Sequence, residues 1–268
     1  MRTISKVLVA ALLLTVVHSI VTGAQAQVAD ARVADLVKAG KIRVGLFVPQ
    51  FTKDAKTGEL RGVWAESARA LAARIGVSLS LVEHPTPPEA IGCLKSSACD
   101  LLFLPFDDRA ASVGDFSPPI FQFDYTLLVP AGSAIRTVAD ADRPGVRIAA
   151  VRNHASTNEL RRRLKQAELV YAETPDPTFE LLRDGQAAAM ASARNTLLAY
   201  AGRLPGSRVL EDRYGANINR MVVPKGMPGR LAYVSEFVEE AKASGMVQKA
   251  IDHVGPRGVT VAPPGDSK

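Results

Sequence analysis

Residues 42–82 read IRVGLFVPQFTKDAKTGELRGVWAESARALAARIGVSLSLV and carry the signals of a strand, a helix and a second strand. Residues 42–46 form an apolar run of the strand type, and residues 65–75 repeat their apolar positions with the period of a helix. Residues 78–82 again favour a strand. This βαβ order is typical of an α/β protein.

The same alternation continues on the C-terminal side and then starts afresh. It predicts strands at 101–104, 125–129, 146–150, 168–171, 187–190 and 220–223, and helices at 88–95, 156–165, 179–184, 195–203 and 230–244. The turns Pro130-Ala131-Gly132 and Pro224-Lys225-Gly226 end the two α/β sets. We therefore expect a discontinuous lobe one (27–128 plus 223–261), a lobe two (129–222), and two connecting strands that act as a hinge beside a cleft.

The N-terminus has the features of an export signal. Arg2 and Lys6 precede an apolar run at 7–17, and Ala24-Gln25-Ala26 supplies small residues for cleavage. We expect a signal peptide at 1–26, cut after Ala26, and no lipid anchor, because no Cys follows the cut. The mature chain is expected to be a soluble periplasmic monomer. Its C-terminal segment at 255–268 is expected to be frayed, with a disordered tail at 262–268.

The composition and charge of the chain limit the classes of molecule that it is expected to bind. The chain has 268 residues and a formal charge of +6, from 33 Lys and Arg against 27 Asp and Glu, with both signs scattered along it. The lack of a basic block argues against nucleic-acid binding. Removing Arg2 and Lys6 leaves 31 basic against 27 acidic side chains, a net charge of +4 and a weak bias towards anionic ligands.

Two cysteines, Cys93 and Cys99, lie six residues apart. In an oxidising compartment we expect them to form a disulfide across a short turn, although two separate buried thiols also fit the sequence. A zinc or thiol-redox site is disfavoured, because the spacing is not C-x-x-C and His84 is the only histidine nearby in the sequence.

An ordered series of short motifs resembles a known family. The series comprises GKIRVG at 40–45, GELRGV at 58–63, LAARIGV at 71–77, CDLL at 99–102, Asp108-Arg109, DFSPP at 115–119, VAD at 138–140, GVRIA at 145–149 and LRDG at 182–185. It resembles the family 3 solute-binding proteins of ABC importers, which include the polar amino-acid binders, and covers about residues 35–253. The resemblance implies the type II periplasmic binding fold, in which each of two lobes is a β-sheet flanked by helices.

The resemblance also implies site residues. The position of Arg109 matches an arginine that reaches from lobe one and forks onto the ligand's carboxylate, which suits guanidinium geometry. A surface ion pair with Asp107 or Asp108 is the alternative. The turn at 152–157 matches a segment that holds the carboxylate's other face, so the ligand-binding candidates from lobe two include Asn153, His154, Ser156 and Thr157. Ser156 or Thr157 capping a helix, with Glu159 completing the box, explains the same residues equally well.

Two departures from the family pattern bear on the ligand. Residues 191–195 (ASARN) lack the acidic residue that accepts from an α-ammonium group, and carry Arg194 instead. A buried ammonium without an anionic partner is costly, so we expect an anionic or neutral organic molecule, gripped by Arg109 and Arg194. Residues 101–108 (LLFLPFDD) are also unusually apolar. Candidate lining residues in lobe one, each also explicable as core, are Phe47, Gln50, Trp64 and Phe106.

The predicted function is capture of a small organic solute by hinge closure and delivery to an ABC permease in the inner membrane. No G-x-S-x-G, H-E-x-x-H or Walker motif is present, and we expect no cofactor, metal or catalytic residue. Two alternatives stay open. A periplasmic enzyme such as a cyclohexadienyl dehydratase needs a cleft acid, for which Asp107, Asp108 and Asp212 are available. A ligand-sensing partner of a membrane receptor would use the same closure.

Overall fold

The computed structural model describes residues 30–47, 50–106 and 108–263. The predicted signal peptide, with its cleavage site after Ala26, lies outside these residues. The strands are β1 (Lys41–Phe47), β2 (Thr52–Lys53), β3 (Leu60–Arg61), β4 (Ser78–His84), β5 (Leu101–Leu104), β6 (Gly114–Val129), β7 (Arg147–Val151), β8 (Glu168–Ala172), β9 (Ala189–Ala193), β10 (Arg208–Val209), β11 (Gly215–Pro224) and β12 (Val259–Val261).

The helices fill the connections between these strands. They are η1 (Ala31–Val33), α1 (Ala34–Ala39), α2 (Val63–Ile75), α3 (Pro87–Lys95), α4 (Asp108–Val113), α5 (Val138–Ala141), α6 (Ala155–Arg163), α7 (Pro175–Arg183), α8 (Arg194–Ala201), α9 (Pro228–Ala243) and α10 (Met246–Val254). Of the described helices, none has the length and apolar character to cross a membrane.

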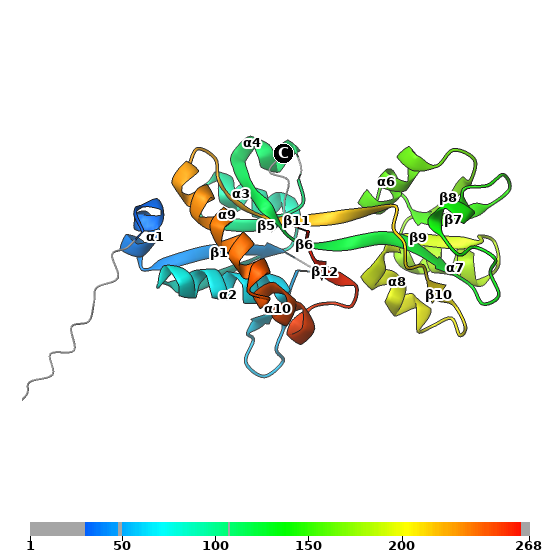
Figure 1. Ribbon diagram of the computed structural model, residues 1–268, viewed down its shortest axis with the longest axis horizontal. Helices are drawn as coiled ribbons and strands as arrows, with labels where there is room; N and C mark the ends of the chain where they lie inside the picture. Colours follow the sequence, from blue (N-terminus) through cyan, green and yellow to red (C-terminus); the bar gives the residue numbers. More distant parts are fainter. Residues whose placement is uncertain (1–29, 48–49, 107, 264–268) are drawn as a thin grey trace, which may run out of the picture.

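One sheet runs through both ends of the molecule. Its strand order is β4-β1-β5-β11-β6-β9-β7-β8, and β10 and β12 pair with β6. The predicted βαβ unit is present: β1 and β4 pair in parallel, and α2 connects them through the β2–β3 hairpin. Gly76, with φ 80°, ends α2 in the left-handed conformation that glycine adopts without strain. The α/β fold class is therefore confirmed (Figure 1).

Helices cover both faces of the sheet in the first lobe. Because side chains alternate along a strand, Leu101 and Phe103 of β5 join one hydrophobic cluster, and Leu102 and Leu104 join another. The first cluster packs against α2, α9 and α10, and the second packs against α3 and α4. This two-sided burial accounts for the almost uniformly apolar sequence of β5.

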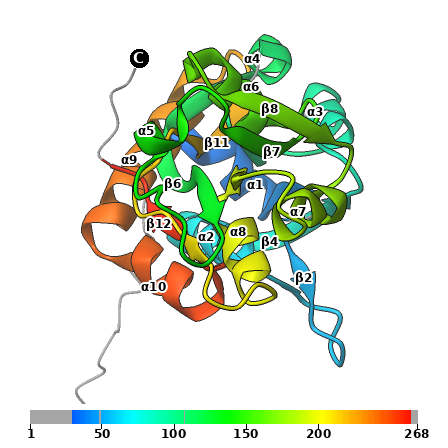
Figure 2. The same cartoon turned by 90° about the vertical axis from the view of Figure 1, so that its right-hand side faces the viewer.

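The second lobe repeats this arrangement around β9 and the end of β6. Ala189 and Ala191 face a cluster with α5 and α6, whereas Met190 faces a cluster with α7 and α8. β7 pairs in parallel with both β8 and β9. The two lobes lie at opposite ends of the long β6–β11 ribbon in Figure 1, and Figure 2 shows the molecule from the end of the second lobe.

The antiparallel strands β6 and β11 carry the chain between the lobes. On β6, Phe123 belongs to the core of the first lobe and Tyr125 to the core of the second. On the return path, Tyr214 belongs to the second core and Met221 to the first. The cores therefore divide near residue 124 and between residues 214 and 221, a few residues before the predicted divisions at 128/129 and 222/223.

Two stretches of the chain form strands that the sequence did not predict. The pattern predicted a strand at 125–129, but β6 begins at Gly114 and passes through Pro118 and Pro119. Proline is normally excluded from a paired strand, and the ladder accommodates it through register shifts near Arg220. The C-terminal segment was expected to be frayed, yet β12 pairs with β6 and Ala262 is buried. Residues 264–268 of the predicted tail lie outside the described residues.

The predicted disulfide is present. Cys93, in the last turn of α3, is bonded to Cys99, which lies just before β5, and their Cα atoms are 5.3 Å apart. It closes a short turn on the α3 side of the first lobe.

Candidate functional site

A cavity of about 570 Å³ lies between the lobes, beside the hinge ribbon. It is lined by Phe47, Gln50, Phe51, Thr52, Arg61, Gly62, Trp64, Pro105, Phe123, Tyr125, His154, Ala155, Ala193, Asn195, Thr196, Asn217, Asn219, Val254, Gly255 and Pro256. The volume suits a small organic molecule.

The hinge strands form one wall of the cavity. Asn217 of β11 pairs with Phe123 of β6, and Gly215 pairs with Tyr125. Because residues two apart share a face of a strand, Phe123 and Tyr125 lie beside Asn217 and Asn219. The strands that connect the two lobes are therefore themselves part of the cavity wall.

A hydrogen-bonded chain orders this wall. Trp64, in the first turn of α2, donates from Nε1 to Asn219 Oδ1 at 3.2 Å, and Asn219 Nδ2 donates to Asn217 Oδ1 at 3.0 Å. The Trp64 ring stacks on Phe123, with centroids 5.5 Å apart. Burial raises the pKa of Tyr125 to about 12, partly opposed by a hydrogen bond with Asn217. The tyrosine hydroxyl therefore stays protonated at neutral pH.

The wall from the first lobe is mainly apolar. Phe47 ends β1, and Gln50 is buried directly after it. Gln50 donates from Nε2 to Phe103 O at 2.7 Å and accepts from Phe47 N at 3.2 Å. Its amide is thus used within the protein, and Gln50 links the end of β1 to β5 while it lines the cavity.

The wall from the second lobe is built from the starts of two helices. His154 is the N-cap of α6, where its Nδ1 accepts from Ser156 N at 3.3 Å and lies 2.7 Å from Ser156 Oγ. Ala193 is the N-cap of α8 and has no side chain to cap it. Asn195 Oδ1 is buried without a hydrogen-bond partner among the described residues. Within the described part of the chain, no N-cap side chain therefore accepts from the first-turn N–H groups of α8.

Desolvation lowers the pKa of His154 and so favours its neutral form. The ring is exposed to the open cleft, yet the protein packed around it desolvates the imidazole and lowers its pKa. Because Nδ1 accepts hydrogen bonds, the proton of the neutral ring is on Nε2. His154 can therefore offer the cavity an N–H donor.

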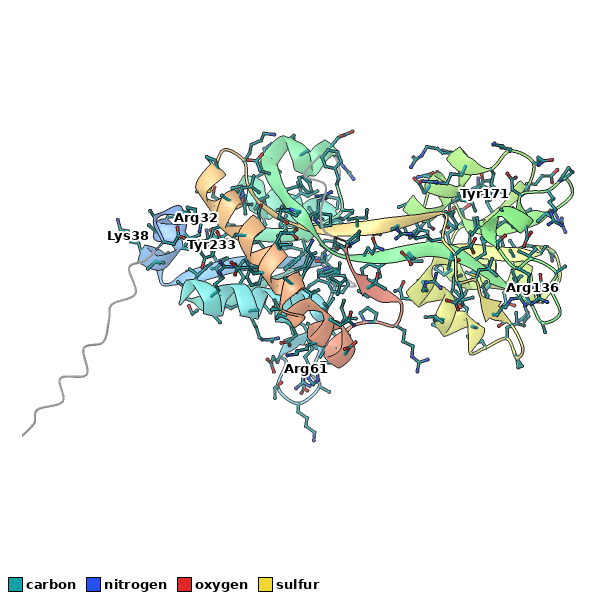
Figure 3. All side chains as sticks on the ribbon, in the orientation of Figure 1. Arg32, Lys38, Arg61, Arg136, Tyr171 and Tyr233 are labelled. Atoms are coloured by element: carbon teal, nitrogen blue, oxygen red, sulfur yellow. A yellow bond between two sulfur atoms is a disulfide. The ribbon has the colours of Figure 1, made fainter. Side chains whose placement is uncertain are left out.

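The described cavity lining carries a positive charge and no negative charge. No Asp or Glu is among the described lining residues, and Arg61 is the one cation among them. Arg61, labelled in Figure 3, ends the β2–β3 hairpin. Its side chain is half-exposed and pairs with Asp54 at 3.0 Å. The described lining thus contains donors and aromatic surface but no group that could neutralise an ammonium ion.

The structure brings together three of the predicted ligand-binding residues. Phe47, Gln50 and His154 line the cavity, and so does Trp64, which is also a core residue. Ser156 and Thr157 are buried behind His154, and Thr157 Oγ1 donates to Val151 O at 2.7 Å. His154, rather than Ser156 or Thr157, provides the N-cap; Glu159 instead pairs with Arg162 and Arg163.

The other predicted residues lie outside the lining. Asn153 is exposed with φ 59°, and Phe106 is 66% exposed with its ring 5.3 Å from that of Phe116. Arg194 donates to Leu210 O and Glu211 O, both at 2.8 Å, so its guanidinium fastens a loop of the second lobe. Arg109 is exposed in the first turn of α4 and is not part of the lining in this conformation.

The sequence analysis did not predict that the hinge strands β6 and β11 and the segment at 254–256 line the cavity. The available signal was the spacing of Asn217 and Asn219, because amides at every second position of a strand form a polar patch on one face. Phe123 and Tyr125 have the same spacing on the neighbouring strand. The contribution of 254–256 had no local signal, since it depends on where β12 pairs.

Comparison with known proteins identifies the family. Residues 42–255 match the bacterial extracellular solute-binding proteins, family 3. The chain belongs to this family. It is 31% identical over 162 residues to the virulence sensor protein BvgS of Bordetella bronchiseptica, a match that covers 60% of this chain and spans 13% of that protein's length. It is 23% identical over 203 residues to the ABC transporter glutamine-binding protein GlnH of Bacillus subtilis, covering 72% of each.

A solved structure supports the same fold. The ancestral cationic amino-acid solute-binding protein AncCDT-1, a precursor of cyclohexadienyl dehydratase, superposes with a TM-score of 0.65 at 24% identity, covering 82% of this chain and 97% of that one. At this identity the similarity is evidence of fold alone.

Proposed function

We propose that this family 3 protein is the extracytoplasmic binding component of an ABC importer, and that it captures a small organic anion that is not a standard amino acid. Membership of the family and the match to GlnH support the transport role. Export by the predicted signal peptide, and docking to a permease in the inner membrane, are parts of the same proposal.

The ligand class rests on one observation: none of the described cavity residues is acidic. Ala193 ends β9 at the edge of the cavity, in the stretch where the family resemblance places the acceptor for an α-ammonium group. An ammonium held there would lose its hydration without gaining an anionic partner, at a cost of several kcal/mol. A zwitterionic amino acid is therefore a poor fit.

An anionic group fits the wall of the second lobe. The starts of α6 and α8 carry the positive ends of their helix dipoles, and α8 has no side-chain cap. His154 adds a neutral N–H donor in the same wall. We infer that a carboxylate or similar acid group of the ligand lies against these two helix starts.

The rest of the ligand faces aromatic surface. Phe47, Phe51 and Trp64 line the cavity from the first lobe, and Phe123 lines it from the hinge strand β6. Aromatic faces favour an apolar or planar body, and the amide chain on the hinge supplies a few oriented polar contacts.

Capture then follows from the position of the cavity between two lobes. A ligand that contacts both walls stabilises a closed form, because only that form makes both sets of contacts. Rotation at β6 and β11 is the simplest motion that brings the walls together. Arg109 lies outside the lining in this conformation, so its predicted role as carboxylate anchor depends on this closure.

Two other functions make distinct predictions. The similarity to BvgS favours a sensing role in which a membrane receptor reads the closed form. A dehydratase would need a cleft acid to protonate a leaving hydroxyl. The absence of a carboxyl group from the described lining disfavours it. Incubation with prephenate tests the enzyme directly, since any aromatic product would overturn the binding-protein proposal.

Matched ligand pairs test the proposal itself. Isothermal titration would compare phenylpropanoate with phenylalanine, and glutarate with glutamate, since each pair differs by the α-amino group. We expect the acid of a pair to bind more tightly than its amino acid. Tighter binding of either amino acid would overturn the proposed ligand class.

A further inference from the structure

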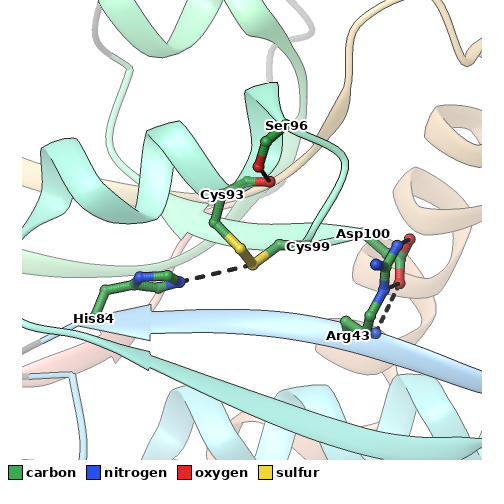
Figure 4. Close-up of a disulfide and its surroundings, with 6 residues drawn as sticks. All are labelled: Arg43, His84, Cys93, Ser96, Cys99 and Asp100. Carbon is green, nitrogen blue, oxygen red and sulfur yellow. Dashed lines mark hydrogen bonds and ion pairs between the residues drawn. A yellow bond between two sulfur atoms is a disulfide. The ribbon is translucent and has the colours of Figure 1, made fainter.

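The disulfide lies beside a histidine that comes from a different strand. His84 is the last residue of β4, and its Nε2 lies 3.8 Å from Cys99 Sγ (Figure 4). A ring nitrogen of His84 and the sulfurs of Cys93 and Cys99 all lie within 4.8 Å of one another. The cysteines are buried, whereas His84 is half-buried, so the cluster has one side open to solvent.

The neighbouring groups do not compete for the three ligand atoms. On β1, the backbone of Gly45 packs against the cluster, since a Cβ there would lie 2.5 Å from Leu102 Cδ2, 3.0 Å from Cys99 Sγ and 3.5 Å from His84 Cδ2. The adjacent carboxylate, Asp100, is occupied by Arg43, which donates from Nε and Nη2 at 2.9 and 2.8 Å. No other hydrogen bond of His84 is found within the described part of the chain, so its ring is free to act as a ligand.

The geometry matches one edge of a tetrahedral site. With zinc about 2.3 Å from sulfur and about 2.0 Å from nitrogen, a tetrahedral angle separates the two ligand atoms by about 3.5 Å. The observed separation of His84 Nε2 and Cys99 Sγ is 3.8 Å. What prevents a site in the oxidised protein is the sulfur–sulfur bond, because thiolates bind zinc and a disulfide does not.

We propose that reduction of the Cys93–Cys99 disulfide creates a site for a thiophilic divalent cation such as Zn²⁺, with His84 as third ligand and water as fourth. A dithiol reductant supplies the two electrons: its thiols become a disulfide while Cys93 and Cys99 become thiols. Binding of the metal ion then releases the two thiol protons. The site is separate from the interlobe cavity and does not depend on the identity of the solute.

Cobalt is the probe, because Co²⁺ bound to thiolates in a tetrahedral site absorbs strongly. The exported protein would be reduced with a phosphine, freed of reductant without oxygen, and titrated with CoCl₂. We expect one Co²⁺ per chain, with thiolate charge-transfer and tetrahedral absorption bands that Zn²⁺ abolishes. The oxidised protein should show neither band. Circular dichroism on the same samples reports whether the reduced chain stays folded.

Variants assign the ligands. His84→Ala should weaken Co²⁺ binding at least about tenfold, because even outer-shell partners of a metal site contribute that much. Its matched control, His253→Ala, removes an exposed histidine of α10 and should bind Co²⁺ like the parent. Cys93→Ser leaves one thiolate, so it should weaken Co²⁺ binding and lower the intensity of the charge-transfer band at saturation. If the reduced protein binds no Co²⁺, or binds it equally well without His84, the proposal is wrong.

Discussion

Substitution of Ala193 by Asp should stabilise the fold and weaken the binding of an anionic ligand. Ala193 is the uncapped N-cap of α8 and lines the cavity. An Asp in this position can accept from the first-turn N–H groups, and a good N-cap is worth about 1 kcal/mol. In a chain of this size that gain raises the melting temperature by about 2 to 4 °C.

The same carboxylate opposes an anionic ligand. Two like charges about 5 Å apart repel by roughly 3 kcal/mol at an effective dielectric constant of 20. The cleft is open to water and salt, so we take about half of that value, which corresponds to a loss of about tenfold in affinity. Ala193→Asp should therefore unfold at a higher temperature and bind the organic acid more weakly.

Ala193→Asn is the matched control, because Asn caps a helix as well as Asp but carries no charge. We expect it to match Ala193→Asp in melting temperature and the parent in affinity. Differential scanning calorimetry gives the first quantity, and titration with the acids of the matched pairs gives the second. An Ala193→Asp variant that binds those acids as tightly as the parent would refute an anion at the start of α8.

Three further predictions test other parts of the account. The pKa of His154 is lowered in the fold, so the unfolded chain takes up its proton first as the pH falls below about 6.5; the parent should lose more stability than His154→Asn between pH 7 and 5, and parallel unfolding curves would refute the shift. Arg109→Ala should weaken binding by about 2 kcal/mol if closure brings a charge-assisted pair to the ligand, and unchanged affinity would reject Arg109 as the anchor. Replacing both Cys93 and Cys99 by Ala should lower the free energy of unfolding by about 2 kcal/mol, because the closed loop is short; urea titration measures this loss, and none would mean that the reduced loop is already ordered.

The regular part of the fold was predictable because its signals are local. Residues 42–46, 65–75 and 78–82 show strand and helix periods, and they become β1, α2 and β4 within a few residues at each end. The disulfide was predictable for a similar reason, since Cys93 and Cys99 are only six residues apart and a single turn is enough to bring them together.

The predictions that were wrong concern segments whose structure depends on contacts with residues far away in the sequence. Pro118 and Pro119 argue against a strand, and only the irregular pairing with β11 allows β6 to pass through them. The segment ending in β12 has loop composition, but its pairing with β6 brings residues 254–256 to the cavity. Neither effect has a signature in a short window of sequence.

The residue types that line the candidate site were easier to predict than the contacts of its individual side chains. The absence of an acid from 191–195 is visible in the sequence and agrees with the described lining. The role of Arg194 was not visible, because its guanidinium binds carbonyl groups in a loop some 16 residues further along the chain. Similarly, His154 caps α6 through a ring nitrogen, a role in which sequence rules favour Ser or Thr.

Native mass spectrometry of the exported protein, purified without unfolding, tests the central claim most directly. A small molecule released from the complex by collisional activation can be weighed and fragmented. We expect an organic acid without an α-amino group, present at one copy per chain. An α-amino acid released at the same stoichiometry would contradict the ligand class that the cavity lining supports.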